Sequence, residues 1–158
     1  MVNLPFEKVK PFAAPCSKIL GKTDVVGGQR SCASAVVPRI QSYRDLIAWQ
    51  KAMDLVILIY QLTENFPARE RFGLAFELRK SAVSIPSNIS EGHSQGSGAY
   101  VRHLVIAVGS HSETSTQSEI AFRLKFIVGA DRIALENLLG EVGRLTQGLL
   151  NSQRRPVP

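Results

Sequence analysis

The stretch LRKSAVSIPSNISEGHSQGS, Leu78–Ser97, carries a proline in the middle of a helical pattern. Its apolar residues recur at spacings of three and four, which is typical of one helix face, and the pattern keeps its phase past Pro86. Because Pro86 lacks an N–H and its ring crowds the carbonyl of Ala82, we expect a kinked helix that continues through the proline. Short polar side chains that can bond to the bent backbone follow or flank it; they are Ser84, Ser87, Asn88 and Ser90.

Helical patterns also occur on both sides of this stretch. Segment Tyr43–Phe66 carries two adjacent apolar stripes, an arc too wide for one neighbouring helix to cover. The kinked helix is expected to begin near Ala68 or Arg69, with Gly92 as its C-terminal stop. Ser97 is the expected N-cap of a third helix.

Two more helices complete the pattern. The third is expected to run from about Gly98 to Ile127, and the fourth from Asp131 or Arg132 to about Asn151. No segment alternates with period two for long enough to predict a strand. Four helices with short connections predict an all-α fold, an antiparallel up-down-up-down four-helix bundle. An irregular all-α domain is the alternative.

The composition indicates one soluble domain, because the chain has 158 residues, of which 44% are hydrophobic and 20% charged. We expect a bundle domain over residues 42–152, a poorly ordered arm over residues 1–41 and an exposed tail over residues 153–158. No apolar run is long enough to cross a membrane, and we expect no signal peptide, because no basic segment with a continuous apolar core follows Met1. We therefore expect a cytoplasmic protein with no membrane partner.

The net charge of +6 belongs to the two ends of the chain. The arm holds six basic and two acidic residues, and Arg154 and Arg155 add two more positive charges near the C-terminus. The segment between them is neutral, so charge alone does not make the bundle a nucleic-acid binder. Cys16 and Cys32 both lie in the arm, where we expect free thiols.

Three blocks resemble a known family. They are YRDLIAWQKAMDLV (Tyr43–Val56), LRKSAVSIPSNISEG (Leu78–Gly92) and IAVGSHSETSTQSEIA (Ile106–Ala121). They are similar to the motifs of bacterial four-helix-bundle proteins encoded in intervening sequences of 23S ribosomal RNA genes. The motif positions that carry the resemblance are Trp49, Pro86, Asn88, Glu91, Gly92 and Glu113.

The resemblance implies a bundle that assembles into a ring-like homopentamer and has no established enzymatic activity. It also implies kinship with the accessory protein of diversity-generating retroelements, which works with a reverse transcriptase and structured RNA. The wide apolar arc of segment Tyr43–Phe66 fits oligomerisation independently, although it does not predict five copies.

One departure from the family lies in the third helix, where the chain has His111, Thr114 and Ser118 at positions that are usually apolar. This departure makes close packing of that helix uncertain. One hypothesis makes His111 a base for a hydroxyl nucleophile, but no motif supplies an oxyanion site. We favour a polar stripe facing solvent or a pore, or a hydrogen-bonded patch. The histidine spacings fit no metal site, and we expect no catalytic residue and no cofactor.

Basic residues of the bundle are the candidate contacts for RNA phosphates: Arg79, Lys80, Arg102, Arg123 and Lys125. A solvated face balanced by acidic residues is the plainer interpretation. Tyrosines could stack on bases, but Tyr60 falls on the predicted core stripe and Tyr100 on the seam of the third helix.

Together these patterns predict a non-catalytic, homo-oligomeric bundle that binds structured RNA or a ribonucleoprotein through basic surface residues. The alternative is a protein–protein adaptor, for example an accessory subunit of a reverse transcriptase, with no RNA specificity of its own.

Overall fold

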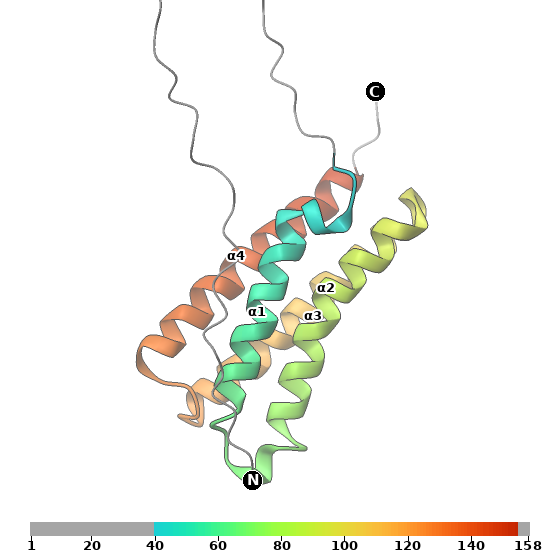
Figure 1. Cartoon of the computed structure of the whole chain (residues 1–158). Helices are drawn as coiled ribbons and strands as arrows, with labels where there is room; N and C mark the ends of the chain where they lie inside the picture. The colour runs from blue at the N-terminus through green and yellow to red at the C-terminus, as the bar shows by residue number, and fades with distance from the viewer. Residues whose placement is uncertain (1–39, 155–158) are drawn as a thin grey trace, which may run out of the picture. The chain divides into compact units, whose positions relative to one another are not determined.

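The computed structural model describes residues 40–154, except for the side chain of Ser97. This part of the chain holds four α-helices and no strand (Figure 1). They are α1 (Ile47–Thr63), α2 (Leu74–Gln95), α3 (Ser97–Arg123) and α4 (Gly129–Arg154), with 3-10 turns η1 (Tyr43–Asp45) and η2 (Ala68–Glu70). Each helix packs against two others, α1 against α2 and α4, and α3 against α2 and α4. The prediction of an all-α fold with four helices is confirmed.

The predicted arm and tail fall almost entirely outside the described residues, and so do Cys16 and Cys32. Within residues 40–154, no helix combines the length and the apolar composition that a bilayer crossing requires.

The second helix begins later than predicted. Residues around Ala68 form only the turn η2, because the backbone of Gly73, with φ of −103° and ψ of −123°, is not helical and separates this turn from α2. The carboxylate of Glu70 then accepts a hydrogen bond of 3.2 Å from the N–H of Leu74, the first residue of α2. An acidic group at this position also suits the positive end of the helix dipole.

The third helix ends earlier than predicted, at Arg123, because Lys125 adopts the left-handed conformation with φ of 58°. The N–H of Phe126 bonds to the carbonyl of Ala121 at 2.9 Å, and that of Lys125 bonds to Phe122 at 3.0 Å. This pair of bonds is the Schellman motif, which closes a helix C-terminus.

The fourth helix is longer than predicted, since it begins at Gly129, before Asp131, and runs past Asn151 to Arg154.

The prediction that Gly92 stops the second helix is wrong. Helix α2 continues to Gln95, and Gly96, with φ of 90°, makes the turn into α3. Ser97 is the first residue of α3 and not its N-cap. Gly92 is needed for another reason: a Cβ atom there would lie 2.7 Å from the Cβ of His103 on α3. Glycine therefore sets how closely α2 and α3 approach.

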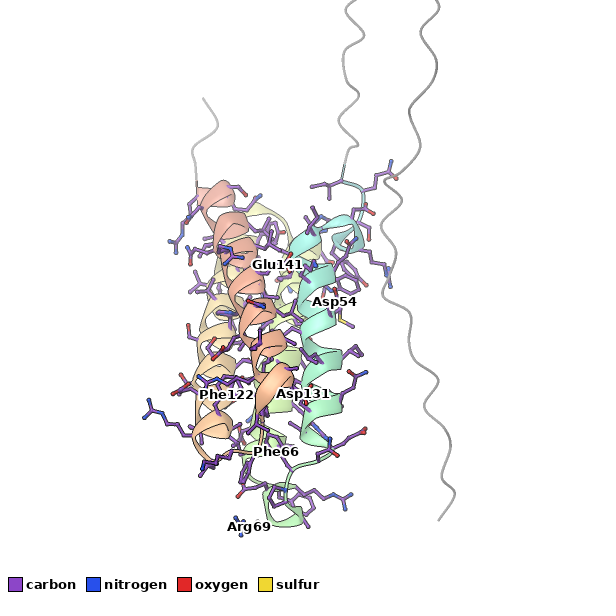
Figure 2. All side chains as sticks on the ribbon, turned by 90° about the vertical axis from the view of Figure 1, so that its left-hand side faces the viewer. Asp54, Phe66, Arg69, Phe122, Asp131 and Glu141 are labelled. Atoms are coloured by element: carbon purple, nitrogen blue, oxygen red, sulfur yellow. The ribbon has the colours of Figure 1, made fainter. Side chains whose placement is uncertain are left out.

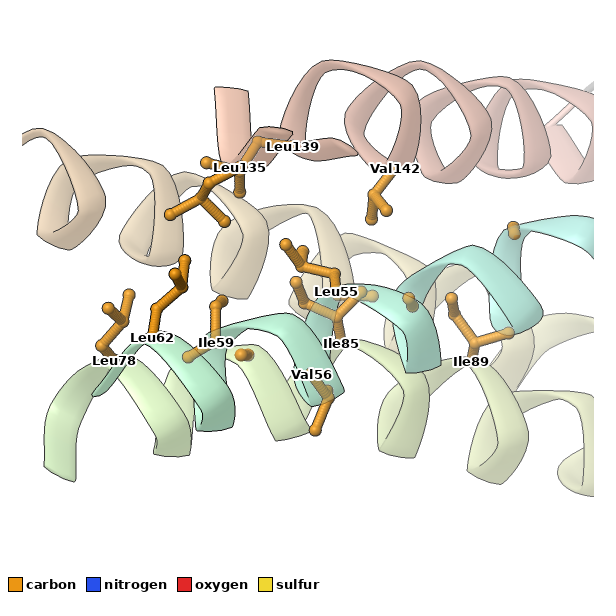
Figure 3. Packing of buried hydrophobic residues seen from close by; sticks show 14 of the residues in the cluster. Leu55, Val56, Ile59, Leu62, Leu78, Ile85, Ile89, Leu135, Leu139 and Val142 are labelled. Carbon is orange, nitrogen blue, oxygen red and sulfur yellow. The ribbon is translucent and has the colours of Figure 1, made fainter. Parts of the chain in front are cut away.

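The core is formed by one of the two predicted stripes of α1. Ala48, Ala52 and Leu55 are buried with Ile59 and Leu62, against leucines, isoleucines and valine of α2 and α4 (Figure 3). The other stripe is peripheral: Leu46 and Val56 are buried, whereas Trp49 and Met53 are half-buried and Tyr60 is exposed. The prediction that Tyr60 belongs to the core is wrong.

Polar side chains join α2 to α3 along their contact. The hydroxyl of Thr114 lies 3.0 Å from that of Ser81, which also lies 2.6 Å from Oε1 of Gln117. One turn further along, the hydroxyls of Ser84 and Ser110 are 2.7 Å apart. We call this set the polar seam: Ser81, Ser84, Asn88, His103, Ser110, Thr114 and Gln117.

Asn88 extends the polar seam toward the α2–α3 turn. Its amide donates to the carbonyl and hydroxyl of Ser84, at 2.9 and 3.1 Å. Because Oδ1 of Asn88 is then the free acceptor, Nδ1 of His103 donates to it at 3.1 Å. Oε2 of Glu91 lies 3.8 Å from the same Nδ1 atom of His103.

Thr114 and Ser118 are fully buried, so the hypothesis of a solvent-facing stripe is wrong for them. Each hydroxyl donates to the carbonyl four residues earlier, at 2.8 Å. His111 turns toward α4, where its Nε2 donates to the carbonyl of Leu139 at 2.8 Å. A Cβ at Gly143 would lie 2.7 Å from the imidazole, so this glycine makes room for the ring. Of the three alternatives for these polar residues, the structure contains the hydrogen-bonded patch. The third helix packs closely against α4 at His111.

Helix α2 continues through Pro86, as the phase of the sequence pattern predicts, and the proline is buried. Neighbouring side chains do bond to the backbone here: Ser87 donates to the carbonyl of Val83 at 2.8 Å and Ser90 to that of Ser87 at 2.9 Å. The kink itself stays a prediction.

The contact at Gly92 yields a stability prediction. Gly92→Ala is expected to lower the free energy of unfolding by about 1–3 kcal/mol, because the added methyl group overpacks the helix contact. The matched control is Gly148→Ala on the exposed face of α4, where a Cβ meets nothing within 4 Å. That change should stabilise the fold by about 0.5–1 kcal/mol through helix propensity. Denaturant unfolding checks both, and equal effects would contradict the close approach.

Tyr100 yields a second prediction, because its hydroxyl is buried without a hydrogen-bond partner among the described residues. Burial raises the pKa of Tyr100 above its ordinary value of 10.0. The unfolded chain therefore loses this proton first as the pH rises, and stability falls above about pH 10. Tyr100→Phe should be nearly neutral at pH 7 and lose less stability between pH 9 and 11. Urea unfolding at several pH values measures the difference, and parallel curves would contradict it.

Candidate nucleic-acid interface

Two connections meet at one end of the bundle, residues 64–73 between α1 and α2 and residues 124–128 between α3 and α4. The rings of Phe66 and Phe126 join them, with centroids 5.3 Å apart. Figure 2 shows Phe66 and Arg69 at this end of the bundle, and Figure 1 shows the α2–α3 turn at the opposite end. We call the end that holds these two connections the loop end.

Arg79 is fixed from two sides at the loop end. Its Nε donates to Oγ1 of Thr63 at 2.7 Å, and its guanidinium carbon lies 4.8 Å from the ring centroid of Tyr60. Thr63 is itself held, because its hydroxyl lies 2.6 Å from the carbonyl of Ile59. Among residues 40–154 no carboxylate lies within ion-pair distance of Arg79, so its charge is not neutralised there.

A pocket of about 320 Å³ opens beside this arginine. Two arginines line it, Arg71 and Arg79, together with the acidic residue Glu64. Its remaining walls are mostly apolar; they come from Thr63, Phe66, Pro67, Ala68 and Ala75.

Arg71 is a residue that the sequence analysis missed. It makes no ion pair within the described part of the chain, and its guanidinium carbon lies 5.7 Å from the ring centroid of Phe72. Because Glu70 lies between Arg69 and Arg71 in the sequence, sequence order alone does not predict which arginine it pairs with. In the structure Arg69 approaches Glu70, at 3.8 Å, which leaves Arg71 free among these residues.

The other predicted cations divide into two groups. Lys80 pairs with Glu77 at 3.5 Å and Arg123 with Glu119 at 2.7 Å, both on exposed surface where such pairs contribute little to stability. Lys125 makes no ion pair in residues 40–154, and Arg102 lies in the first turns of α3, away from the loop end. The structure therefore gathers Arg79, Lys80, Arg123 and Lys125 at the loop end and separates Arg102 from them.

The motif positions that carry the family resemblance lie mostly at contacts between elements of the bundle. Pro86, Asn88 and Gly92 lie on α2 where it faces its neighbours, and the ring of Trp49 packs edge-on to Tyr43 at 5.3 Å. Glu113 is exposed on α3. Within residues 40–154, no group of three histidine, cysteine or acidic residues is placed to hold a metal ion.

Comparisons with known proteins agree on the fold. A family model described as 23S rRNA-intervening sequence protein matches residues 44–148, more than half of the chain. A crystal structure of a protein with unknown function, from the S23 ribosomal protein family of Bacteroides thetaiotaomicron VPI-5482, superposes with a TM-score of 0.62. The two sequences are 21% identical, and the alignment covers 68% of this chain and 98% of that chain. The comparison with curated proteins finds no match.

Lys125 has a left-handed backbone conformation, and two substitutions there distinguish the effect of backbone strain on stability from the effect of the charge. Lys125→Gly is expected to raise the free energy of unfolding by about 0.5–1 kcal/mol, because glycine adopts φ of 58° without strain. Lys125→Ala removes the same charge and keeps the strain, so it is the matched control. Thermal unfolding measures both variants, and equal stability of the two would contradict the Schellman geometry.

Proposed function

Because the chain belongs to the 23S rRNA-intervening sequence protein family, we propose that it is a non-catalytic protein that binds structured RNA or a ribonucleoprotein. The loop end is the binding surface, and several copies present it together in a homo-oligomer. The bundle alternates in direction, up-down-up-down, with a bend at Pro86, and the protein acts in the cytoplasm, where such RNA occurs.

One observation carries the RNA proposal: Arg71 and Arg79 both line one pocket, and neither is neutralised by a carboxylate of residues 40–154. A guanidinium group suits phosphate because its planar N–H groups match two phosphate oxygens. Lys125 adds a third positive charge at the same end.

Homo-oligomerisation strengthens such a surface, because repeated copies convert weak single contacts into avid binding. Exposed apolar residues on the outer face of α3 support an interface between copies, since each contributes apolar area that a second copy can bury. They are Val105, Ile106 and Ile120. The family resemblance makes the expected assembly a ring of five.

A second candidate function is the protein–protein adaptor. Its supporting observation is a shallow groove of about 240 Å³ between α1 and α2, lined on its apolar side by Trp49, Met53, Val56, Val83 and Pro86. An apolar groove suits a partner side chain better than RNA. A reverse transcriptase is one such partner, as kinship with the retroelement accessory protein suggests.

The test of RNA binding compares two pairs of charge removals. Labelled hairpin RNA is titrated at several salt concentrations against the full chain, Arg71→Gln/Arg79→Gln and the control Arg102→Gln/Arg144→Gln. The first double variant should bind more weakly and lower the salt slope by about 0.7–0.9 per lost phosphate contact. The control, which loses the same charge away from the pocket, should behave as the unaltered chain does.

Unfolding curves accompany the titration, because Arg79→Gln also removes the bond to Thr63. Absence of any RNA binding at low salt would contradict the proposal and favour the adaptor. Equal loss in both double variants would show that general charge, and not the loop end, attracts the RNA.

A further inference from the structure

The size and the lining of the pocket at the loop end limit the class of ligand that it can bind. Its volume of about 320 Å³ is at the lower limit of small-molecule sites and is far too small for a nucleic-acid duplex. Two arginines provide positive charge on part of the wall, and Phe66, Pro67 and Ala75 provide apolar surface on another part. The ligand must therefore join an anionic group to a compact apolar body.

We propose that this pocket binds one unpaired nucleotide, with the phosphate on Arg71 and Arg79 and the base against the apolar wall. The inference rests on the proposed function, since it names the part of the RNA that the loop end accepts. Bases splayed out of RNA loops commonly insert into protein pockets, whereas paired bases stay stacked.

The fixed position of Arg79 favours phosphate binding. Nε of Arg79 donates to Thr63, and the ring of Tyr60 lies against the guanidinium group. The arginine side chain is therefore held in place before a ligand binds. Less conformational entropy is then lost on binding. The two terminal nitrogens are the remaining donors of the fork, and they can hold two oxygens of one phosphate.

Glu64 gives the pocket a preference among bases. Its carboxylate lines the same space as the two arginines and would repel an anion that has no other contact. A carboxylate accepts hydrogen bonds from exocyclic amino groups, which adenine and cytosine carry and uracil lacks. AMP and CMP should therefore bind better than UMP, and inorganic phosphate alone should bind poorly.

The experiment titrates the full chain with AMP, CMP, UMP, adenosine and inorganic phosphate, and follows the backbone amide signals of the pocket by NMR. AMP and CMP should shift the signals of Thr63, Ala68 and Ala75 saturably. Adenosine, UMP and phosphate should each bind about tenfold more weakly or worse, because adenosine lacks the phosphate, UMP lacks the amino group and inorganic phosphate lacks the base. Phosphate binding as tight as that of AMP, or shifts outside the pocket, would overturn the inference.

Variants identify the groups that contact the ligand. Arg79→Lys keeps the charge and loses the fork, so AMP affinity should fall about tenfold, while Arg102→Gln should leave it unchanged. Glu64→Gln should reduce the preference of AMP over UMP. An acidic peptide that displaces AMP and binds more tightly would assign the pocket to a protein partner and overturn the nucleotide proposal.

A second arm separates this inference from the proposed function. Hairpin RNA with an unpaired loop should compete with AMP for the pocket, and a fully paired duplex should not. If both RNAs bind equally and Arg79→Lys affects neither, RNA binding stands and the nucleotide pocket is wrong. If AMP binds the pocket but no RNA binds, the pocket is a site for free nucleotides and the proposed RNA function is wrong.

Discussion

The close approach of α2 and α3 is the constraint on which the rest of the bundle depends. Gly92 permits it, because any side chain at that position would occupy the space of His103 and Tyr100. The polar seam then fills the contact with small hydroxyl-bearing residues, so that two polar helix faces can be buried without losing their hydrogen bonds. The apolar side chains of all four helices then form the core, to which α3 contributes Leu104, Ala107 and Ala121.

The sequence predicts the helices themselves because apolar spacing is a local property. Prediction from the sequence is wrong where the end of a helix depends on the backbone conformation and not on the side chains. Gly92 resembles a helix stop in sequence, yet packing against α3 explains it, whereas Gly96 makes the turn. Lys125 shows the reverse case, since nothing in a lysine predicts the left-handed conformation that ends α3. His111, Thr114 and Ser118 departed from an apolar pattern, but spacing could not show that buried partners would satisfy them.

The candidate site was predictable only in part, for a related reason. Sequence identifies cations, but their availability depends on which carboxylate lies nearby in space. Arg79 and Lys80 are adjacent in the chain, yet Glu77 pairs with Lys80, and Thr63 and Tyr60 fix Arg79 beside the pocket. The charge of Arg71 is available to a ligand because Glu70, the acidic residue between Arg69 and Arg71, approaches Arg69.

The polar seam also determines which motions the bundle allows. Hydrogen bonds cross from α2 to α3 at Ser81, Ser84 and Asn88, so a shift of α2 along α3 by one turn would leave several buried groups without a hydrogen bond. Apolar contacts, such as those of α1 with α4, tolerate small sliding at lower cost. The hairpin of α2 and α3 is thus the part of the described bundle whose register is fixed by the most hydrogen bonds, whereas one bond, from His111 to Leu139, joins α3 to α4.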